Sequence, residues 1–542
     1  MLGCSLPLRY APARLRGNLL FAATATLLNA CAVGPDFQRP APPAASTYSP
    51  QPLPAETRAT ALPQGEAQRF DPARDIPFEW WKEFQSPALD ALVARAFRAN
   101  PDLVAAQAAL RQAQENVVVQ RGFLFPTVGV SYSPSRNKLA GNNGGSSPGV
   151  QGNGKIIQTY SNPAGPVFNG PAYYSFHVAQ LGISYQPDVF GLNRRLVESA
   201  EAQARLQRFQ LEATYVTLAA NVVGAAIQEA ALRAQQEAVL EVVKLNRELL
   251  ALSERQKQLG YASEADVAAQ QAVLSAAELS LAALDKQHWQ ARDLLNALVG
   301  ARPDEAVKSV PLDALRLPHE LPLTLPSRLV EQRPDVRAAE EQLHVASAQT
   351  GVAIAATLPQ FALLANIGGM ASSPDWMFRH GGGFFSLAGN IAYTIFDGGS
   401  LRARSRAAQA ALEQSAALYQ GTVIAALQNV ADTLHVIQAD ADALHAAADN
   451  EAAHARLLAV ARKGYETGYT SYVDRLVVEQ NHLLAELTLI QTQATRLGDC
   501  AALYQALGGG WWQRSADASS LFTPSSASPP ANTGTTPGND PS

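Results

Sequence analysis

The sequence of 542 residues is poor in cysteine, methionine and charged side chains. It holds three Cys and three Met, and charged residues make up only 16% of it, against roughly 25% in average soluble domains. So few methionines argue against a copper-carrying protein. The formal net charge of −5 argues against nucleic acid as a partner.

Patterns that bind metals or carry catalysis are also missing. The nine histidines are scattered, and none belongs to a His-Glu-x-x-His motif. His435, His445 and His454 share a helical stretch, but their spacings do not stack them on one face. No P-loop is present. We therefore expect no enzyme activity and no metal or cofactor.

Beyond the N-terminus, the sequence shows no apolar run of the about 20 residues that a membrane-spanning helix needs. Residues 1–30 are typical of a signal peptide, with three early arginines, an apolar stretch at Leu19–Leu28 and the small Ala30 before the cut. Cys31 follows as in a bacterial lipobox, which predicts lipidation. The alternative is an ordinary signal peptide followed by an incidental Cys. Ala32, in place of Asp, favours the outer membrane.

The other two cysteines fit this interpretation. Cys4 would leave with the signal peptide, and Cys500 would then have no partner for an internal disulfide. Because Cys500 lies in an apolar helical stretch, we expect a small buried side chain rather than a reactive thiol. The only covalent group expected is the N-acyl and diacylglycerol lipid on Cys31.

The chain repeats itself. Residues Arg95–Ala106 return as Arg328–Ala339, and the stretch Arg194–Gly300 aligns without a gap with Arg402–Gly508. A repeat this long is not a short solenoid unit. The sequence predicts two halves, 78–310 and 311–512, so any function must suit a pseudo-symmetric object.

Flanking segments have a different composition. Residues 31–77, rich in Pro, Ala, Ser and Gln from position 34, are typical of an extended linker without regular structure. Residues 513–542 are dominated by Ser, Pro, Thr, Gly and Asn, which is typical of a disordered tail.

Long helices fill most of each half. Residues 192–258 contain no Pro and one interior Gly, and strong helix formers dominate. A break at Gly260-Tyr261 and a cap at Ser263 turn the chain back, which predicts a helical hairpin at about 192–300. The second half repeats it at about 400–508. Small apolar residues spread widely round these helices, as expected in a wall of helices with neighbours on two sides.

Strands are expected between the helices. Phe385, Leu387 and Ile391 alternate with Ser386, Asn390 and other small or polar residues over about ten positions, the length of a transmembrane β-strand. We expect β-hairpins at about 125–189 and 360–396, the first with a long loop at 135–172. Four strands cannot close a barrel, and open edges are not tolerated in lipid. Two, three or four copies of the chain would have to share one barrel.

These features together resemble the TolC-like outer-membrane factors, and in particular the lipoprotein branch (NodT-type) that serves resistance-nodulation-division (RND) multidrug efflux systems. The resemblance covers about residues 31–510. The matching motifs are Cys31–Pro40, Trp80–Phe84, Asn100–Asp102, Phe396–Gly399, and the two hairpin tips Gly260–Asp266 and Gly468–Asp474.

The resemblance implies a mixed, mainly α fold with four transmembrane strands and long periplasmic helical hairpins per chain. Three chains would close a twelve-stranded β-barrel continuous with an α-helical barrel. The homotrimer would sit in the outer membrane, lipid-anchored, and extend into the periplasm. Its partners would be a periplasmic adaptor protein and an inner-membrane RND pump, and small toxic compounds would leave through it without chemistry.

In this family the hairpin tips meet the adaptor and form the closed iris. The residues placed there by position are Gly260, Tyr261, Ser263, Asp266, Gly468, Tyr469, Ser471, Tyr472, Asp474 and Arg475. Relatives carry an Asp facing the pore where this chain has Val477. We expect Asp474, Arg475 and Glu479 either to replace that acidic ring or to be solvated surface.

Two other functions stay open. The same trimer could serve heavy-metal efflux or type I protein secretion, and gene neighbours would discriminate them. A lipid-anchored structural coiled-coil protein that spaces the envelope is the alternative from another class. The amphipathic strands argue against it.

Overall fold

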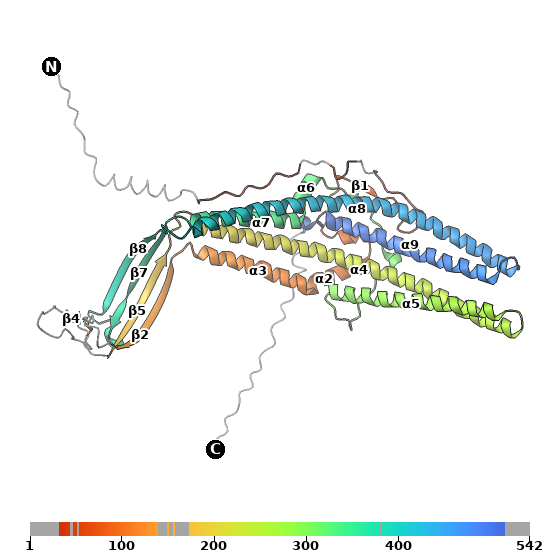
Figure 1. Cartoon of the computed structure of the whole chain (residues 1–542), viewed down its shortest axis with the longest axis horizontal. Coiled ribbons are helices and arrows are strands. Elements are labelled where there is room, and N and C mark those ends of the chain that lie inside the picture. Colours follow the sequence, from red (N-terminus) through yellow and green to blue (C-terminus); the bar gives the residue numbers. More distant parts are fainter. Residues whose placement is uncertain are drawn as a thin grey trace, which may run out of the picture. The chain divides into compact units, whose positions relative to one another are not determined.

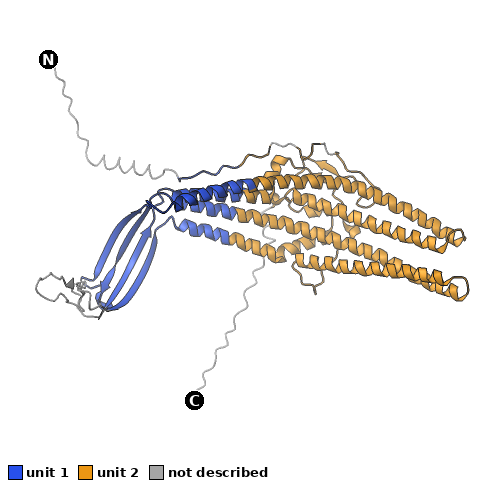
Figure 2. Ribbon diagram, in the orientation of Figure 1, with its two compact units in different colours: residues 1–39, 112–205, 340–417 blue, residues 40–111, 206–339, 418–542 orange. Residues whose placement is uncertain are grey.

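The computed structural model describes residues 32–43, 47–50, 54–138, 149–150, 156–157, 173–379 and 381–514. The expected signal peptide, Cys31, most of the loop 135–172 and nearly all of the expected tail lie outside these residues. The chain divides into two compact units, coloured separately in Figure 2. Unit 1 holds residues 1–39, 112–205 and 340–417, and unit 2 holds residues 40–111, 206–339 and 418–542.

The two halves contain helices of matching length. The pairs are α3 (Pro101–Gly122) and α7 (Pro334–Ala355) with 22 residues each, α4 (Leu192–Gln258) and α8 (Ser400–Glu466) with 67, and α5 (Glu264–Leu298) and α9 (Tyr472–Ala506) with 35. Figure 1 shows α4 turning into α5, and α8 into α9, as two helical hairpins. The expected mainly helical fold with duplicated halves is confirmed.

The start of α3 is capped by Asn100. Asn100 Oδ1 accepts hydrogen bonds from the backbone N–H groups of Asp102 at 2.9 Å and Leu103 at 3.2 Å. Two of the otherwise unpaired donors of the first turn are thereby satisfied. Pro101 lacks an N–H group, but at the first helical position this group would have no partner within the helix, so no hydrogen bond is lost.

Unit 1 contains a four-stranded antiparallel sheet in the order β2-β5-β7-β8. Its strands are β2 (Thr127–Lys138), β5 (Tyr173–Tyr185), β7 (Gln360–Ala371) and β8 (Gly383–Ala392). The two β-hairpins therefore lie side by side, with β5 paired to β7 (Figure 1). Two short strands, β3 (Gly149–Val150) and β4 (Ile156–Ile157), pair within the stretch expected to be a loop.

Unit 2 holds the largest hydrophobic core. The turn η1 (Trp80–Phe84) and the helix α2 (Pro87–Ala99) pack their aromatic and aliphatic side chains against α4 and α9. The Trp80 ring stacks on the Tyr504 ring with 5.1 Å between centroids, and both are fully buried. Each fully buried large apolar side chain contributes about 1.5–3 kcal/mol. The remaining short elements are η2 (Leu312–Ala314), α6 (Pro326–Gln332), η3 (Pro374–Trp376) and η4 (Trp511–Gln513).

The expected linker is more ordered than its composition indicates. Residues Arg69–Asp71 form β1, which pairs in parallel with β6 (Glu320–Pro322). The fully buried Arg496 of α9 donates to the carbonyl oxygens of Gln64 at 3.0 Å and Glu66 at 2.8 Å. A buried guanidinium needs such acceptors. The expectation of a linker without regular structure is wrong for this stretch. The segment is attached to the helices partly through its backbone carbonyl groups, which every residue type has, so its sequence shows no hydrophobic periodicity that would predict the attachment.

Cys500 is fully buried, as expected, and accepts a hydrogen bond on Sγ from Gln68 Nε2 at 3.1 Å. Burial raises the pKa of its thiol to about 12, which keeps it protonated and unreactive near neutral pH.

The expectation about apolar runs needs a correction. Both α4 and α5 contain a window of 18 residues apolar enough by composition to cross a membrane. In α4, 78% of that window is buried within the chain, as in a core helix, against 17% in α5. Small residues such as Ala raise the mean hydropathy of a window without forming an uninterrupted run of large apolar side chains.

Candidate functional site

One face of the unit 1 sheet is apolar and open. Because side chains alternate along each strand, the register places apolar residues of all four strands on the same face. They are Val128, Val130 and Tyr132 on β2, Leu181 and Ile183 on β5, Leu363, Ala365 and Ile367 on β7, and Phe385, Leu387 and Ile391 on β8. Leu387 is 80% exposed. So much exposed apolar surface requires a lipid or protein environment.

The other face of the same sheet carries mainly small and polar residues, with a few apolar ones such as Leu364 and Met370. Gln180 lies opposite Ser131, and Asn366 opposite Ser386, whose hydroxyl accepts from Asn366 Nδ2 at 3.3 Å. Gly129 and Gly182 face each other here; Gly129 has open space around it, whereas the Asn366 side chain lies close to Gly182. Apolar and polar faces on strands of 10 to 13 residues are the pattern of outer-membrane strands.

The residues that follow Cys31 are held by unit 1. Val33 N donates to Phe190 O at 3.2 Å, and the buried Arg195 donates to Asp36 Oδ1 at 2.7 Å. A side chain at Gly191 would meet Ala32, since its Cβ would lie 2.6 Å from the Ala32 Cα. Phe37 stacks on the His344 ring with 4.1 Å between centroids. Lipidation itself falls on Cys31, outside the described residues, and stays a prediction.

The tip of the first hairpin has a defined turn. Gly260 adopts φ 82°, which favours glycine, and its N–H donates to Lys257 O at 3.0 Å. Ser263 and Asp266 then form a capping box, in which Asp266 Oδ2 accepts from Ser263 N at 2.7 Å and Asp266 N donates to Ser263 Oγ at 3.2 Å. The Ser263 hydroxyl also donates to Asp266 Oδ2 at 2.7 Å, and this bond, together with the one from Ser263 N, lowers the pKa of the Asp266 carboxyl.

The tip of the second hairpin repeats this geometry. Gly468 adopts φ 81°, and Tyr469 N donates to Gly464 O at 2.8 Å. Ser471 caps α9 by accepting from Asp474 N at 3.1 Å, and its hydroxyl donates to Asp474 Oδ2 at 2.6 Å. The predicted tip residues are therefore brought together in two matching turns.

Each tip presents one almost fully exposed tyrosine. Tyr261 is 83% exposed and Tyr469 is 91% exposed. Val477, where the family resemblance implies a pore-facing Asp, is also exposed. Exposed aromatic residues on a rigid turn are suited to contact a partner protein.

Arg475 and Glu479 are neither solvated surface nor a ring of exposed charges. Glu479 is 7% exposed, and Arg462 Nη2 of α8 donates to its Oε1 at 2.8 Å. The Arg475 guanidinium lies 5.0 Å from the Tyr465 ring centroid and 5.3 Å from that of Tyr472. Contacts within the chain therefore occupy both side chains, which are largely buried. Asp474 is exposed and lies in the first turn of α9, where its carboxylate accepts a hydrogen bond from the Ser471 hydroxyl.

A buried polar contact joins the second hairpin to the first. Tyr472 of α9 donates its hydroxyl hydrogen to Gln270 Oε1 of α5 and accepts from Ser253 Oγ of α4 at 3.2 Å. Gln270 in turn donates to Asn246 Oδ1 of α4 at 2.9 Å. Burial raises the pKa of the Tyr472 hydroxyl, so it remains a donor at neutral pH. We call these four residues the inter-hairpin tie.

Sequence reasoning found only one member of the tie. Tyr472 is predicted as a tip residue from its position, and the first tip has Glu264 in the matching place. Asn246, Ser253 and Gln270 are common surface residues of long helices, so their types carry no signal. Only the packing of α9 against α4 and α5 identifies them.

A family model described as "Outer membrane efflux protein" matches residues 92–301 and 325–509. Among curated proteins, a probable efflux pump outer membrane protein, TtgC of Pseudomonas putida, is 29% identical over 505 residues, which cover 92% of this chain and 97% of TtgC. The pyoverdine export outer membrane protein OpmQ of Pseudomonas aeruginosa is 29% identical over 439 residues, 80% of this chain and 87% of OpmQ.

Solved structures show the same fold. The outer-membrane channel OprN superposes with a TM-score of 0.74 at 27% identity, covering 89% of this chain and all of that one. The CmeC outer membrane channel of Campylobacter jejuni superposes equally well, at 0.74, with 20% identity and coverage of 91% and 98%. The second likeness concerns the fold alone.

Proposed function

We propose that this chain, which belongs to the outer membrane efflux protein family, is the outer-membrane channel of a tripartite RND-type efflux pump. In this role it is a passive exit duct for small toxic compounds. The observation that carries the proposal is the four-stranded sheet with one apolar and one polar face. The names of the relatives, efflux pump and export outer membrane proteins, support it.

The channel is proposed to be a homotrimer. β2 and β8 are the outer strands of the sheet, and each has one neighbour among the described strands. Unpaired strand edges are costly in lipid, so the edges of different copies must pair. Three copies give a barrel of twelve strands, wide enough for a lumen, whereas the eight strands of two copies would be filled by side chains.

The anchor is proposed to be the lipid on Cys31. Residues 32–37, held by Arg195 and His344, fix the start of the mature chain against the unit that carries the sheet. The acyl chains would then enter the same membrane leaflet that the base of the barrel meets.

The tips are proposed to contact the adaptor protein, and the inter-hairpin tie to hold the channel closed. Tyr261 and Tyr469 offer exposed aromatic contacts. Opening requires α9 to move from α4 and α5, which breaks the hydrogen bonds of Tyr472. A neutral buried tie of this kind is worth about 0.5–1.5 kcal/mol per bond, small enough for an adaptor to overcome.

Planar-bilayer recording of the purified protein tests both parts. We expect trimer-sized channels that are mostly closed, and a several-fold higher open probability in Tyr472→Phe, which lacks the hydroxyl. Tyr469→Phe, an exposed tyrosine of the same tip, is the matched control and should behave like the natural chain. Absence of any conductance would leave the structural envelope protein as the better reading. If the protein conducts but Tyr472→Phe has an unchanged open probability, the role of the inter-hairpin tie in closing the channel is wrong and the channel function stands.

A further inference from the structure

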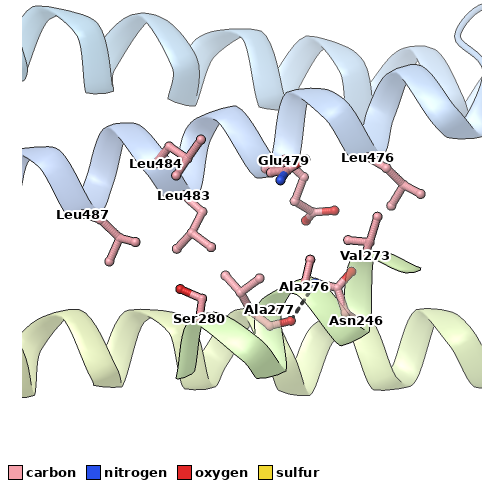
Figure 3. Close-up of a pocket in the computed structure, with 12 residues that line it drawn as sticks. Asn246, Val273, Ala276, Ala277, Ser280, Leu476, Glu479, Leu483, Leu484 and Leu487 are labelled. Atoms are coloured by element: carbon pink, nitrogen blue, oxygen red, sulfur yellow. Dashed lines mark hydrogen bonds between the residues drawn. The ribbon is translucent and has the colours of Figure 1, made fainter. Parts of the chain in front are cut away.

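A cavity lies between α9 and the α4–α5 hairpin, close to the inter-hairpin tie. Its walls are mostly aliphatic, with Val273, Ala276 and Ala277 on α5 facing Leu476 and Leu483 on α9 (Figure 3). It offers about 90 Å³ of space to water-sized molecules and is partly open to solvent. Drug-sized ligands need pockets of about 300–1,000 Å³. The cavity therefore suits a molecule of one ring, not a bulky efflux substrate.

One charged side chain points into this cavity. Figure 3 shows the carboxylate of Glu479 between α9 and α5. Its Oε1 accepts from Arg462, while its Oε2 is buried and accepts no hydrogen bond from the described residues. The nearest cation to Oε2 is Arg475 Nη2, at 3.9 Å. A buried carboxylate oxygen without a hydrogen-bond donor raises the free energy of the folded chain, so a ligand that donates a hydrogen bond to Oε2 would be favoured.

The charges around Oε2 determine whether a ligand that donates a hydrogen bond to it should be cationic, anionic or neutral. Arg462 and Arg475 already surround the single carboxylate of Glu479 with two positive charges. A ligand cation would add a third positive charge at close range, and a ligand anion would meet the Oε2 that faces the cavity. A neutral hydroxyl group avoids both penalties and supplies the missing hydrogen bond.

We propose that this cavity binds a small uncharged molecule with an apolar ring and one hydroxyl group, of the size of a phenol, which donates to Glu479 Oε2. The ring packs against Val273, Ala277 and Leu483. Because the ligand contacts helices of both hairpins, it holds α9 against α5 and favours the closed arrangement. This last effect rests on the proposed channel function, whereas the binding does not.

Binding is measured by ¹⁹F NMR of the full chain in detergent, with 4-fluorophenol and fluorobenzene as probes. The two probes share a ring and a reporter nucleus and differ in the hydroxyl group. We expect 4-fluorophenol to bind about ten-fold tighter or more, as a hydrogen bond to a charged group implies. Glu479→Gln should lose most of this preference. Glu278→Gln, the same change on α5 outside the cavity, is the matched control and should keep it.

A second variant covers the risk that Glu479→Gln disturbs folding. Ala276→Phe fills the cavity from an exposed helix position and leaves Glu479 and both arginines in place, so it should fold and bind neither probe. Equal affinity for the two probes, or unchanged 4-fluorophenol binding in Ala276→Phe, would overturn the proposal. In bilayers, 4-fluorophenol should lower the open probability of the natural chain and not of Ala276→Phe. Loss of all conductance with binding intact would count against the channel and not against the site.

Discussion

At the scale of single residues, the tip glycines are needed for their backbone angle and not for space. A Cβ at Gly468 would meet nothing within 4 Å, yet its φ of 81° is unfavourable for any other residue. Gly421, inside α8, also has open space around it, but its helical φ is ordinary. The same substitution should therefore have opposite effects at the two positions.

We expect Gly468→Ala to destabilise the second tip by about 1–2 kcal/mol, the cost of a left-handed Ala. Gly421→Ala should stabilise α8 by about 0.5–1 kcal/mol, since Ala loses less backbone entropy in a helix. Denaturant unfolding of the detergent-solubilised chain measures both changes. Unchanged stability in Gly468→Ala would contradict the role of the backbone angle, and a loss in Gly421→Ala would contradict the open space at that position.

At the scale of elements, the start of α5 should be sensitive to acid. Hydrogen bonds from Ser263 lower the folded-state pKa of Asp266 below its ordinary value of about 3.9. A lowered folded pKa means that the carboxylate supports the cap fully above the unfolded value, and that this support is lost as pH falls through the folded value. The cap should thus be constant near neutral pH and weaken below about pH 4.

Hydrogen–deuterium exchange of the peptide around Ser263, corrected for the intrinsic effect of pH, detects this fraying. Asp266→Asn should show no such acid step. Ser263→Ala should fray at every pH, at a cost of about 1 kcal/mol. An acid step that persists in Asp266→Asn would assign it to another group.

The elements were largely predictable because each depends on local patterns. The long helices follow from the absence of Pro and the abundance of Ala, Leu, Gln and Glu, and the strands from alternation such as Phe385, Leu387 and Ile391. Attachment of the N-terminal segment through Arg496 was not predictable, since backbone carbonyls accept its bonds. Nor was the inward direction of Glu479, which depends on which neighbours cover α9.

At the scale of the whole molecule, a charged side chain should be destabilising on one face of the sheet and tolerated on the other. We expect Leu387→Arg, on the apolar face of β8, to cost about 2–4 kcal/mol in a bilayer and to reduce the amount of assembled outer-membrane protein. Ser386→Arg, its neighbour on the polar face, should assemble and change conductance instead. Membrane fractionation with native gel electrophoresis compares them. Equal assembly of both variants would contradict the assignment of the apolar face to lipid.

The inter-hairpin tie bears on how the duplicated chain diverged. At the constant spacing of the repeat, Asn246, Ser253 and Gln270 correspond to His454, Ala461 and Val478, and Tyr472 corresponds to Glu264. The first half thus supplies Asn246, Ser253 and Gln270, and the second half supplies Tyr472. Two first halves, or two second halves, would therefore lack the residues for the hydrogen bonds of Tyr472. The two halves have become mutually dependent, so a chain built from the first half twice would keep the architecture and lose the bond.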